Sequence, residues 1–441
     1  MDGFFADTTG LAPPRAHAGR GLMMLLGLHI VACCLSLIFV TEYYPTYNVI
    51  WFDKTGLYAA VPTVALFGLV ALLFVRCRFS FGWFLGFYFY TMVAGYLWLA
   101  PFSKFQYDHV LAGVSAFASA LAFLMPALFI TSPIKQRFVL SATALDHVLS
   151  GILVLAVAVV ACGAYYNFRL VGLTEIYDFR EQLQFPTWLG YAMAGTTNAL
   201  LPFALACFVS REDRWRAGLV LVLLLLFYPI TLSKLALFAP FWLIFLMLLF
   251  RLSGAKTSVV LSLFLPLMGG LLLVLLLKLK LFPTTLFGHY FSTVNLRMMA
   301  FPSIAMDVYN DYFAHHSVTH FCQINLVKRL IDCPATEPLP ILMLNAYHVG
   351  NLNASLFATE GIASVGVVLA PISVFVCGLV IALANRLSAG LPPRFILLSA
   401  GILPQTLLNV PLTIGLVTHG AAALFLLWYV TPRTMFEQPN K

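Results

Sequence analysis

The sequence predicts an all-α polytopic integral membrane protein with about twelve transmembrane helices and one long outer loop. Three observations predict it: the composition, the length of the apolar runs and the placement of the basic residues. Of the 441 residues, 61% are apolar and 10% charged, against roughly 45–50% and about 25% in soluble proteins. Because an aqueous surface needs about 25–35% charged residues, most of this surface must face lipid. The mean hydropathy of +0.93 likewise excludes a disordered chain.

The apolar runs are long enough to be spanning helices, which need about 20 residues to cross a hydrocarbon core roughly 30 Å thick. Residues 218–227 read GLVLVLLLLF, whereas barrel strands alternate apolar and polar residues. Two longer runs are divided at Leu232-Ser233-Lys234 and Asn409-Val410-Pro411, where polar residues or proline interrupt them. The expected spans are 22–41, 57–75, 80–100, 109–131, 146–166, 187–209, 217–232, 235–250, 258–277, 361–384, 395–409 and 412–430.

The basic residues agree with this count, because Lys and Arg gather in the short cytoplasmic loops of membrane proteins. With both termini in the cytoplasm, the cytoplasmic segments carry fifteen of the 25 basic residues. The short outer loops carry Lys54, Lys104, Arg169, Arg180 and Lys234, and the remaining five lie in or beside one long outer segment, which the rule exempts. The net charge of +8 therefore follows topology, and no basic stripe indicates a nucleic-acid partner.

The chain accordingly divides into a cytoplasmic tail (1–21), helices 1–9 (22–281), the long outer loop (282–358), helices 10–12 (359–430) and a second cytoplasmic tail (431–441). The first tail has no cleavage site, so we expect the first span to be a retained signal anchor. Six of the eight cysteines lie in or beside spans and have no metal-ligand spacing. Cys322 and Cys333 lie in the outer loop, where either a disulfide or two thiols are open alternatives.

The outer loop holds an unusual share of the polar chemistry, including five of the ten histidines. Loops of this length are usually functional. Within it, Phe301, Ile304, Ala305, Val308 and Tyr312 recur at helical spacing, with Ser303, Asp307, Asn310 and Asp311 on the other face. This pattern predicts an amphipathic helix, which either lies in the headgroup plane or caps the helix bundle.

Two segments carry a recognisable pattern: 295–313 reads NLRMMAFPSIAMDVYNDYF and 347–366 reads YHVGNLNASLFATEGIASVG. They resemble the bacterial O-antigen and oligosaccharide repeat-unit polymerases of the Wzy type. The matching positions are Arg297, Pro302, Tyr309, Tyr312, Phe313, Asn351, Asn353, Glu360, Gly361 and Gly366. Ser233-Lys234 also resembles a Ser-Lys element of that family, although it lacks the preceding Gly, and Glu360 stands where the family has Asp.

The resemblance implies a membrane glycosyltransferase of the bacterial inner membrane, without a cofactor or metal. Such an enzyme polymerises undecaprenyl-diphosphate-linked repeat units into O-antigen, capsule or exopolysaccharide at the periplasmic face, so 282–358 becomes a periplasmic loop. The implied partners are the lipid-linked oligosaccharide, the bilayer and a chain-length regulator protein. A lipid-linked glycan ligase shares the donor and differs in acceptor, and a polytopic transporter is the other alternative.

This chemistry requires cations for the diphosphate and a proton acceptor for the attacking hydroxyl. Arg297 is the first candidate for the diphosphate and Lys234 the second; the alternative for Arg297 is a salt bridge to Asp307 or Asp311. Lys278 and Lys280 are better explained as side chains at the end of a span. The proton-acceptor candidates are Glu360, Asp307, His289, His315 and His320, none of which is singled out by its spacing, and we select the first three. The glycan-binding candidates are Tyr309, Tyr312, Tyr347, Asn351 and Asn353.

Overall fold

The spanning helices were assigned in a computed structural model, which describes residues 15–44, 52–172, 175–176, 179, 182–324, 327–333, 337–348, 352 and 358–436. Within these residues ten helical segments are long and apolar enough to cross a membrane, and no strand occurs. They coincide with the first ten predicted spans. Their elements are α1 (Arg15–Tyr43), α2 (Lys54–Gly68), α3 (Ala71–Arg76), α4 (Phe81–Leu99), η2 (Ala100–Phe102), α5 (His109–Phe129), α6 (Ala142–Tyr166), α8 (Thr187–Gly195), η3 (Thr196–Leu200), α9 (Leu201–Ser210), α10 (Arg214–Thr231), α11 (Lys234–Ser253), α12 (Ala255–Lys278) and α16 (Ala358–Ser388).

The last two predicted spans differ from the structure. Instead of straight helices over 395–409 and 412–430, the chain forms four short helices, α17 (Pro393–Ser399), α18 (Leu403–Leu407), α19 (Leu412–Val417) and α20 (Ala421–Val430). Proline stands at the beginning of the first three, and Gly420 precedes the fourth with a φ of 75°. Because proline and left-handed glycine end or begin helices, these residues divide an apolar run that composition alone makes continuous.

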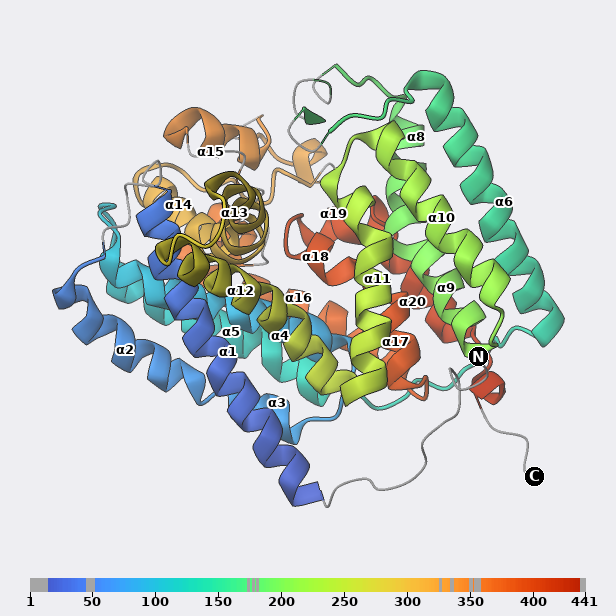
Figure 1. The fold of residues 1–441 in the computed structure, drawn as a ribbon, viewed down its shortest axis with the longest axis horizontal. Coiled ribbons are helices and arrows are strands. Elements are labelled where there is room, and N and C mark those ends of the chain that lie inside the picture. Colours follow the sequence, from blue (N-terminus) through green and yellow to red (C-terminus); the bar gives the residue numbers. More distant parts are fainter. Residues whose placement is uncertain are drawn as a thin grey trace.

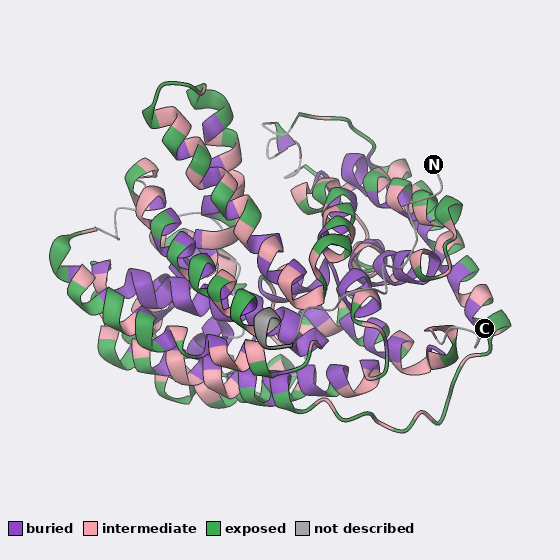
Figure 2. Cartoon of the chain, turned by 60° about the horizontal axis from the view of Figure 1, so that its bottom comes forward, coloured by how far each residue is buried: buried purple, intermediate pink, exposed green. Residues whose placement is uncertain are grey.

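Helix α4 is the central helix of the bundle, since every one of its side chains is buried. Ser80 caps it by accepting a hydrogen bond from the backbone N–H of Trp83 at 3.1 Å. Helices α2, α5, α14 and α16 pack against it. In Figure 2 the buried residues fill the interior, while exposed residues follow the outward sides of the peripheral helices. Those outward sides are apolar, as lipid contact requires, with Val114, Leu225 and Val376 among them.

The outer loop forms several helices of its own: α13 (Thr284–Phe291), the π-helix η4 (Ser292–Ala300), α14 (Phe301–His315), the short η5 (Val327–Arg329) and α15 (Leu339–Tyr347). Figure 1 shows α13, α14 and α15 at the same end of the bundle as the connection that follows α6, at the top. The predicted helix at 301–313 is therefore present as α14, and Pro302 lies in its first turn as expected.

Both faces of α14 are buried, including Ser303, Asp307 and Asn310 on the polar face. The helix packs against α4 and α16. This burial favours the second interpretation of the amphipathic pattern, a helix packed on the bundle, over a helix lying in the headgroup plane. The contact is close at Gly95 of α4, because a Cβ there would lie 2.3 Å from the Ser303 hydroxyl oxygen.

We therefore expect Gly95→Ala to push α14 away from α4 and to lower the thermal midpoint of the detergent-solubilised protein. The overlap corresponds to a loss of about 1–3 kcal/mol. Gly113→Ala on α5 is the matched control, because its Cβ would meet nothing nearer than Leu97 at 3.8 Å. Equal melting temperatures for the two variants would contradict the close packing of α14 on α4.

Candidate functional site

The Asp307 carboxylate anchors α14 to the connection between α4 and α5. It is fully buried and accepts hydrogen bonds from the Ser103 hydroxyl at 2.8 Å and from the Tyr107 hydroxyl. The Tyr107 hydroxyl in turn lies 3.2 Å from that of Tyr96, which accepts a hydrogen bond from the Asn310 amide at 3.2 Å. This group of five polar side chains, Asp307, Ser103, Tyr107, Tyr96 and Asn310, is called the Asp307 network below.

Burial raises the pKa of Asp307 to about 7. The hydrogen bonds from Tyr107 and Ser103 oppose this rise, because they stabilise the ionised form, whereas the negative charge of Asp311 adds to it. Burial beside Asp307 also raises the pKa of Tyr107, so its hydroxyl stays protonated and acts as a donor. The carboxyl therefore changes its charge near neutral pH within a closed site.

The tyrosines predicted to bind glycan lie in two different environments. Tyr309 is fully buried, and its hydroxyl has no hydrogen-bond partner within the described residues. Tyr312 is partly exposed and stacks on His316 at a centroid distance of 4.0 Å. Tyr347 is also partly exposed and donates a hydrogen bond to Asp311 at 2.6 Å. Only Tyr312 and Tyr347 thus present ring surface to the outside, and Asn351 and Asn353 lie outside the described residues.

Glu360 lies in the first turn of α16 and is almost fully buried, with 5% of its surface exposed. Its Oε1 accepts a hydrogen bond from the Gln323 side chain at 3.2 Å, and its Oε2 accepts a long one from the backbone N–H of Leu412 at 3.4 Å. The Gln323 amide also donates to the Ser364 hydroxyl at 2.8 Å. The carboxylate is therefore held between the outer loop and the beginning of α19.

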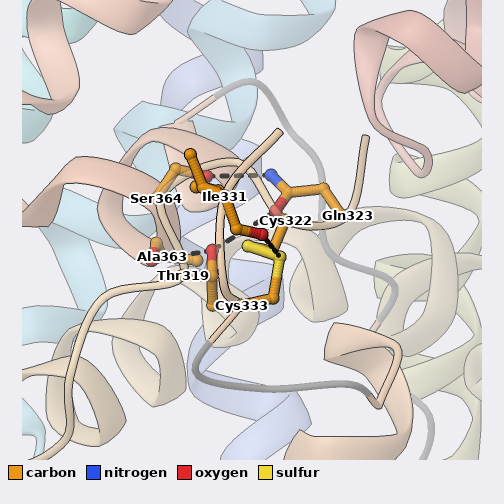
Figure 3. The surroundings of a disulfide bond; sticks show 7 residues. All are labelled: Thr319, Cys322, Gln323, Ile331, Cys333, Ala363 and Ser364. Atoms are coloured by element: carbon orange, nitrogen blue, oxygen red, sulfur yellow. Dashed lines mark hydrogen bonds between the residues drawn. A yellow bond between two sulfur atoms is a disulfide. The ribbon is translucent and has the colours of Figure 1, made fainter. Parts of the chain in front are cut away.

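Helix α16 is broken at Gly366, whose φ of 79° and ψ of 167° favour glycine. On the N-terminal side of the break, the carbonyl oxygens of Ala363 and Ser364 accept hydrogen bonds from the backbone N–H groups of Thr319 and His320, at 2.7 and 3.0 Å. Residues 319–323 of the outer loop thus cover the broken turn, as Figure 3 shows for Thr319 and Gln323. A disulfide joins Cys322 to Cys333 beside this contact, which resolves the alternative left open by the sequence.

The two segments of the sequence pattern meet at the segment 405–412. Met298, Met299 and Pro302 from the first line a cavity of about 30 Å³ together with Gln405, Leu408 and Asn409. Glu360 from the second contacts Leu412. Because α14 also packs against α16, residues more than 50 positions apart in the sequence lie around one part of the fold. The cavity itself has room for water only.

The two predicted cations, Arg297 and Lys234, lie on different elements, η4 and α11. Arg297 is exposed on η4, its guanidinium lies 4.8 Å from the centre of the Phe301 ring, and no described carboxylate is within 4 Å of it. The salt bridge to Asp307 or Asp311 is therefore not formed. Lys234 begins α11 and is partly exposed. Lys278 pairs with Glu42 at 3.5 Å, which agrees with a structural role.

The histidines are spread along the outer surface. His289 is exposed at the end of α13. His315 and His316 each contact the backbone carbonyl four residues earlier, at 2.9 and 2.8 Å. Across the described residues, no group of three or more His, Cys, Asp or Glu side chains is placed to hold a metal ion.

Sequence reasoning missed Ser103, Tyr107 and Gln323, which supply hydrogen bonds to the two buried carboxylates. Ser103 and Tyr107 lie in a short connection that composition marks only as an outer turn. The turn Ser103-Lys104-Phe105-Gln106-Tyr107 is rich in polar groups, which is the one signal that could have identified it.

Comparison of the chain with protein-family models, curated proteins and solved structures found no match.

The pKa of Asp307 predicts a pH-dependent stability. The folded protein keeps the proton up to about pH 7, whereas an unfolded Asp releases it near pH 4. The resulting stabilisation is full below about pH 4 and is lost as the pH rises to about 7. Between about pH 5 and about pH 8, we expect the melting temperature of the wild type to fall relative to that of Asp307→Asn, which stays neutral.

Tyr107→Phe is the companion variant, because it removes a donor that stabilises the ionised carboxylate. It should raise the pKa of Asp307 and move the decline in stability to higher pH. Melting curves of wild type and Asp307→Asn that run parallel across this range would show that Asp307 does not titrate there.

The disulfide predicts the number of thiols that react with maleimide after unfolding. Six cysteines have free thiols, Cys33, Cys34, Cys77, Cys162, Cys207 and Cys377. Intact-mass measurement should therefore find six labels without reductant and eight after reduction. Cys322→Ser alone should give seven labels without reductant, since it releases Cys333. Eight labels on unreduced wild-type protein would contradict the disulfide.

Proposed function

We propose that this protein is a membrane glycosyltransferase that polymerises undecaprenyl-diphosphate-linked oligosaccharide repeat units at the periplasmic face of the bacterial inner membrane. The observation that supports it is the meeting of the two pattern segments around 405–412, which Glu360 contacts at Leu412 and the η4–α14 junction contacts through the small cavity. Residues that serve one reaction are expected to lie close together in the fold, and residues of these two segments do.

Arg297 is the proposed ligand of the donor diphosphate. Its guanidinium is exposed and has no described carboxylate partner, so its donors are available to phosphate oxygens. Arginine binds phosphate through two parallel hydrogen bonds, and this pairing stabilises the charge that develops on a diphosphate leaving group. The Phe301 ring on one face of the guanidinium fixes its orientation. Lys234 is the proposed second cation.

Glu360 is the proposed proton acceptor for the attacking sugar hydroxyl. Its Oε2 accepts only a long hydrogen bond, at 3.4 Å from the Leu412 N–H, and a substrate hydroxyl within hydrogen-bond reach can replace it. Asp307 is less suited to that role, because Ser103 and Tyr107 occupy both of its oxygens and none of its surface is exposed. We assign Asp307 to the positioning of α14, and His289 remains the exposed alternative base.

A transporter is the second candidate, and one observation favours it. Transporter sites are often built from interrupted helices near the middle of the membrane. Here the π-helix η3 interrupts the segment formed by α8 and α9, and its buried Asn198 contacts His419 at 3.2 Å and accepts a hydrogen bond from Thr406 at 2.9 Å.

The proposed function is tested by reconstituting the purified protein with undecaprenyl-diphosphate-linked repeat units and resolving the products on a gel. Wild type should give a ladder of glycans, and Arg297→Ala should lower the rate by on the order of a hundredfold, the usual cost of one charged donor in the transition state. Glu360→Gln should abolish the ladder, because the amide cannot accept the proton. Arg329→Ala is the matched control, because Arg329 is an exposed arginine in the same outer segment.

Two results would contradict the polymerase. Consumption of the donor only when a lipid A-type acceptor is added would identify a ligase. No consumption with either acceptor, combined with uptake of a solute by the same vesicles, would identify a transporter. An equal loss of polymerisation rate in Arg297→Ala and Arg329→Ala would show that Arg297 does not bind the diphosphate.

A further inference from the structure

The helical run from Thr284 to His315 carries Arg297 near its middle, in the π-helix η4. Helices α13, η4 and α14 follow one another without a gap, and η4 packs against α1 and α12. A π-helix is a rare form of the backbone. Each residue of register lost on conversion to an α-helix would rotate the two flanking helices by about 100° against each other. The direction of Arg297 therefore depends on the contacts that hold η4 in place.

Asn295 connects η4 to both neighbouring spanning helices. Its side chain is fully buried, and its Nδ2 donates hydrogen bonds to the Ser36 hydroxyl on α1 at 2.8 Å and to the Leu267 carbonyl on α12 at 3.3 Å. Gly270 of α12 leaves room for this side chain, because a Cβ there would overlap the Asn295 amide. One side chain thus fixes the π-helical segment against two helices.

These hydrogen bonds lie well inside the ends of the two spanning helices. Ser36 precedes Tyr43, the last residue of α1, by seven residues, and Leu267 precedes Lys278, the last residue of α12, by eleven. At 1.5 Å per residue, these separations correspond to about 10 Å and about 16 Å along the helices. Polar contacts that are shielded from water are stronger than contacts at the surface. The Asn295 contacts are therefore able to hold η4 firmly.

Asn295 and Arg297 lie on opposite sides of η4. Two residues correspond to about half a turn of helix. Accordingly, Asn295 has no exposed surface, whereas Arg297 is exposed. With Asn295 fixed, the Arg297 guanidinium points away from α1 and α12, and a rotation of η4 would turn it toward them.

Packing alone does not explain an asparagine at this position. The Asn295 Oδ1 is buried and has no hydrogen-bond partner within the described residues. An unpaired buried acceptor lowers stability, and a leucine of similar volume would avoid that loss. What leucine would not supply is the donor that fixes the rotation of η4.

We propose that Asn295 is a positioning residue, which holds η4 against α1 and α12 so that the Arg297 guanidinium is directed toward the donor diphosphate. This inference rests on the proposed role of Arg297 and names the group that sets its direction. The Asp307 network holds α14 ten residues further along the chain, whereas Asn295 acts within half a turn of the arginine.

The test measures diphosphate binding separately from polymerisation. Farnesyl diphosphate, a short polyprenyl diphosphate, is titrated into the full-length protein in detergent and followed by calorimetry, with farnesol as the uncharged comparison. Wild type should bind farnesyl diphosphate, and Arg297→Ala should weaken this binding at least about tenfold, because hydrogen bonds between charged groups are lost.

Asn295→Leu should also weaken farnesyl diphosphate binding about tenfold, although Arg297 is still present. Its melting temperature should equal or exceed that of wild type, because the unpaired acceptor is removed together with the donor, and the Ser36 hydroxyl can bond within its own helix. A purely structural role of Asn295 predicts the reverse, a lower melting temperature with unchanged affinity.

Three further variants serve as partner and controls. Gly270→Ala should weaken binding as well, because its methyl group displaces the Asn295 amide, whereas Gly288→Ala on α13 adds the same group in open space and should bind like wild type. Asn167→Leu removes another buried asparagine, which donates to two carbonyl groups of α10. It should lower the melting temperature and leave the affinity unchanged.

The outcomes separate this inference from the proposed function. A folded Asn295→Leu with wild-type affinity would overturn the positioning role, and Gly270→Ala carries the test if Asn295→Leu does not fold. Binding that depends on both Arg297 and Asn295, in a protein that forms no glycan ladder, would contradict the polymerase and leave this inference standing. Wild-type binding that is absent, or equal to that of Arg297→Ala, would overturn both the diphosphate role of Arg297 and this inference.

Discussion

The hydrogen bonds of the fully buried helix α4 are the interactions on which the rest of the structure depends. Without a hydrophobic driving force between helices inside lipid, close packing and interhelical hydrogen bonds must select the neighbours. The Thr91 hydroxyl lies 3.0 Å from His29 on α1, the Tyr88 hydroxyl lies 2.8 Å from Ser262 on α12, and Asn385 on α16 accepts from the backbone N–H of Gly82 at 2.7 Å. Each of these hydrogen bonds fixes the position of one neighbouring helix along the axis of α4. The helix is also less apolar than the other spans, because it contacts protein on all sides.

The Asp307 network extends this arrangement to the outer end of α4. Ser303 of α14 donates to the Met92 carbonyl at 3.0 Å, and Asn310 reaches Tyr96 one turn further along α4. Asp307 then fixes the turn after α4 through Ser103 and Tyr107. The position of Arg297, which lies on η4 directly before α14, therefore depends on polar contacts inside the bundle rather than on any contact of its own with a carboxylate. In the proposed role of Arg297, this support from α14 leaves its guanidinium donors available to a ligand.

The sequence predicted the ten long spans because a run of about 20 apolar residues has no other stable form in lipid. It did not predict the four short helices near the C-terminus, because proline and glycine interrupt a helix without changing mean hydropathy. The pattern at 295–313 correctly predicted a helix, but periodicity could not show that its polar face is buried, since α4 supplies the partners from 200 residues away. The roles of Arg297 and Glu360 still rest on the resemblance, whereas the partners of Glu360, Gln323 and Leu412, come from the structure alone.

The break in α16 has a consequence for how the chain is assembled. Carbonyl groups exposed by an interrupted helix are costly in lipid unless a donor is supplied from elsewhere. Here the donors are Thr319 and His320, which precede α16 in the chain and belong to the outer loop. During synthesis from the N-terminus, these two donors are made before α16. The groups that cover the broken turn therefore exist before the turn itself, so the order of the chain shortens the period in which the carbonyl groups of α16 lack donors.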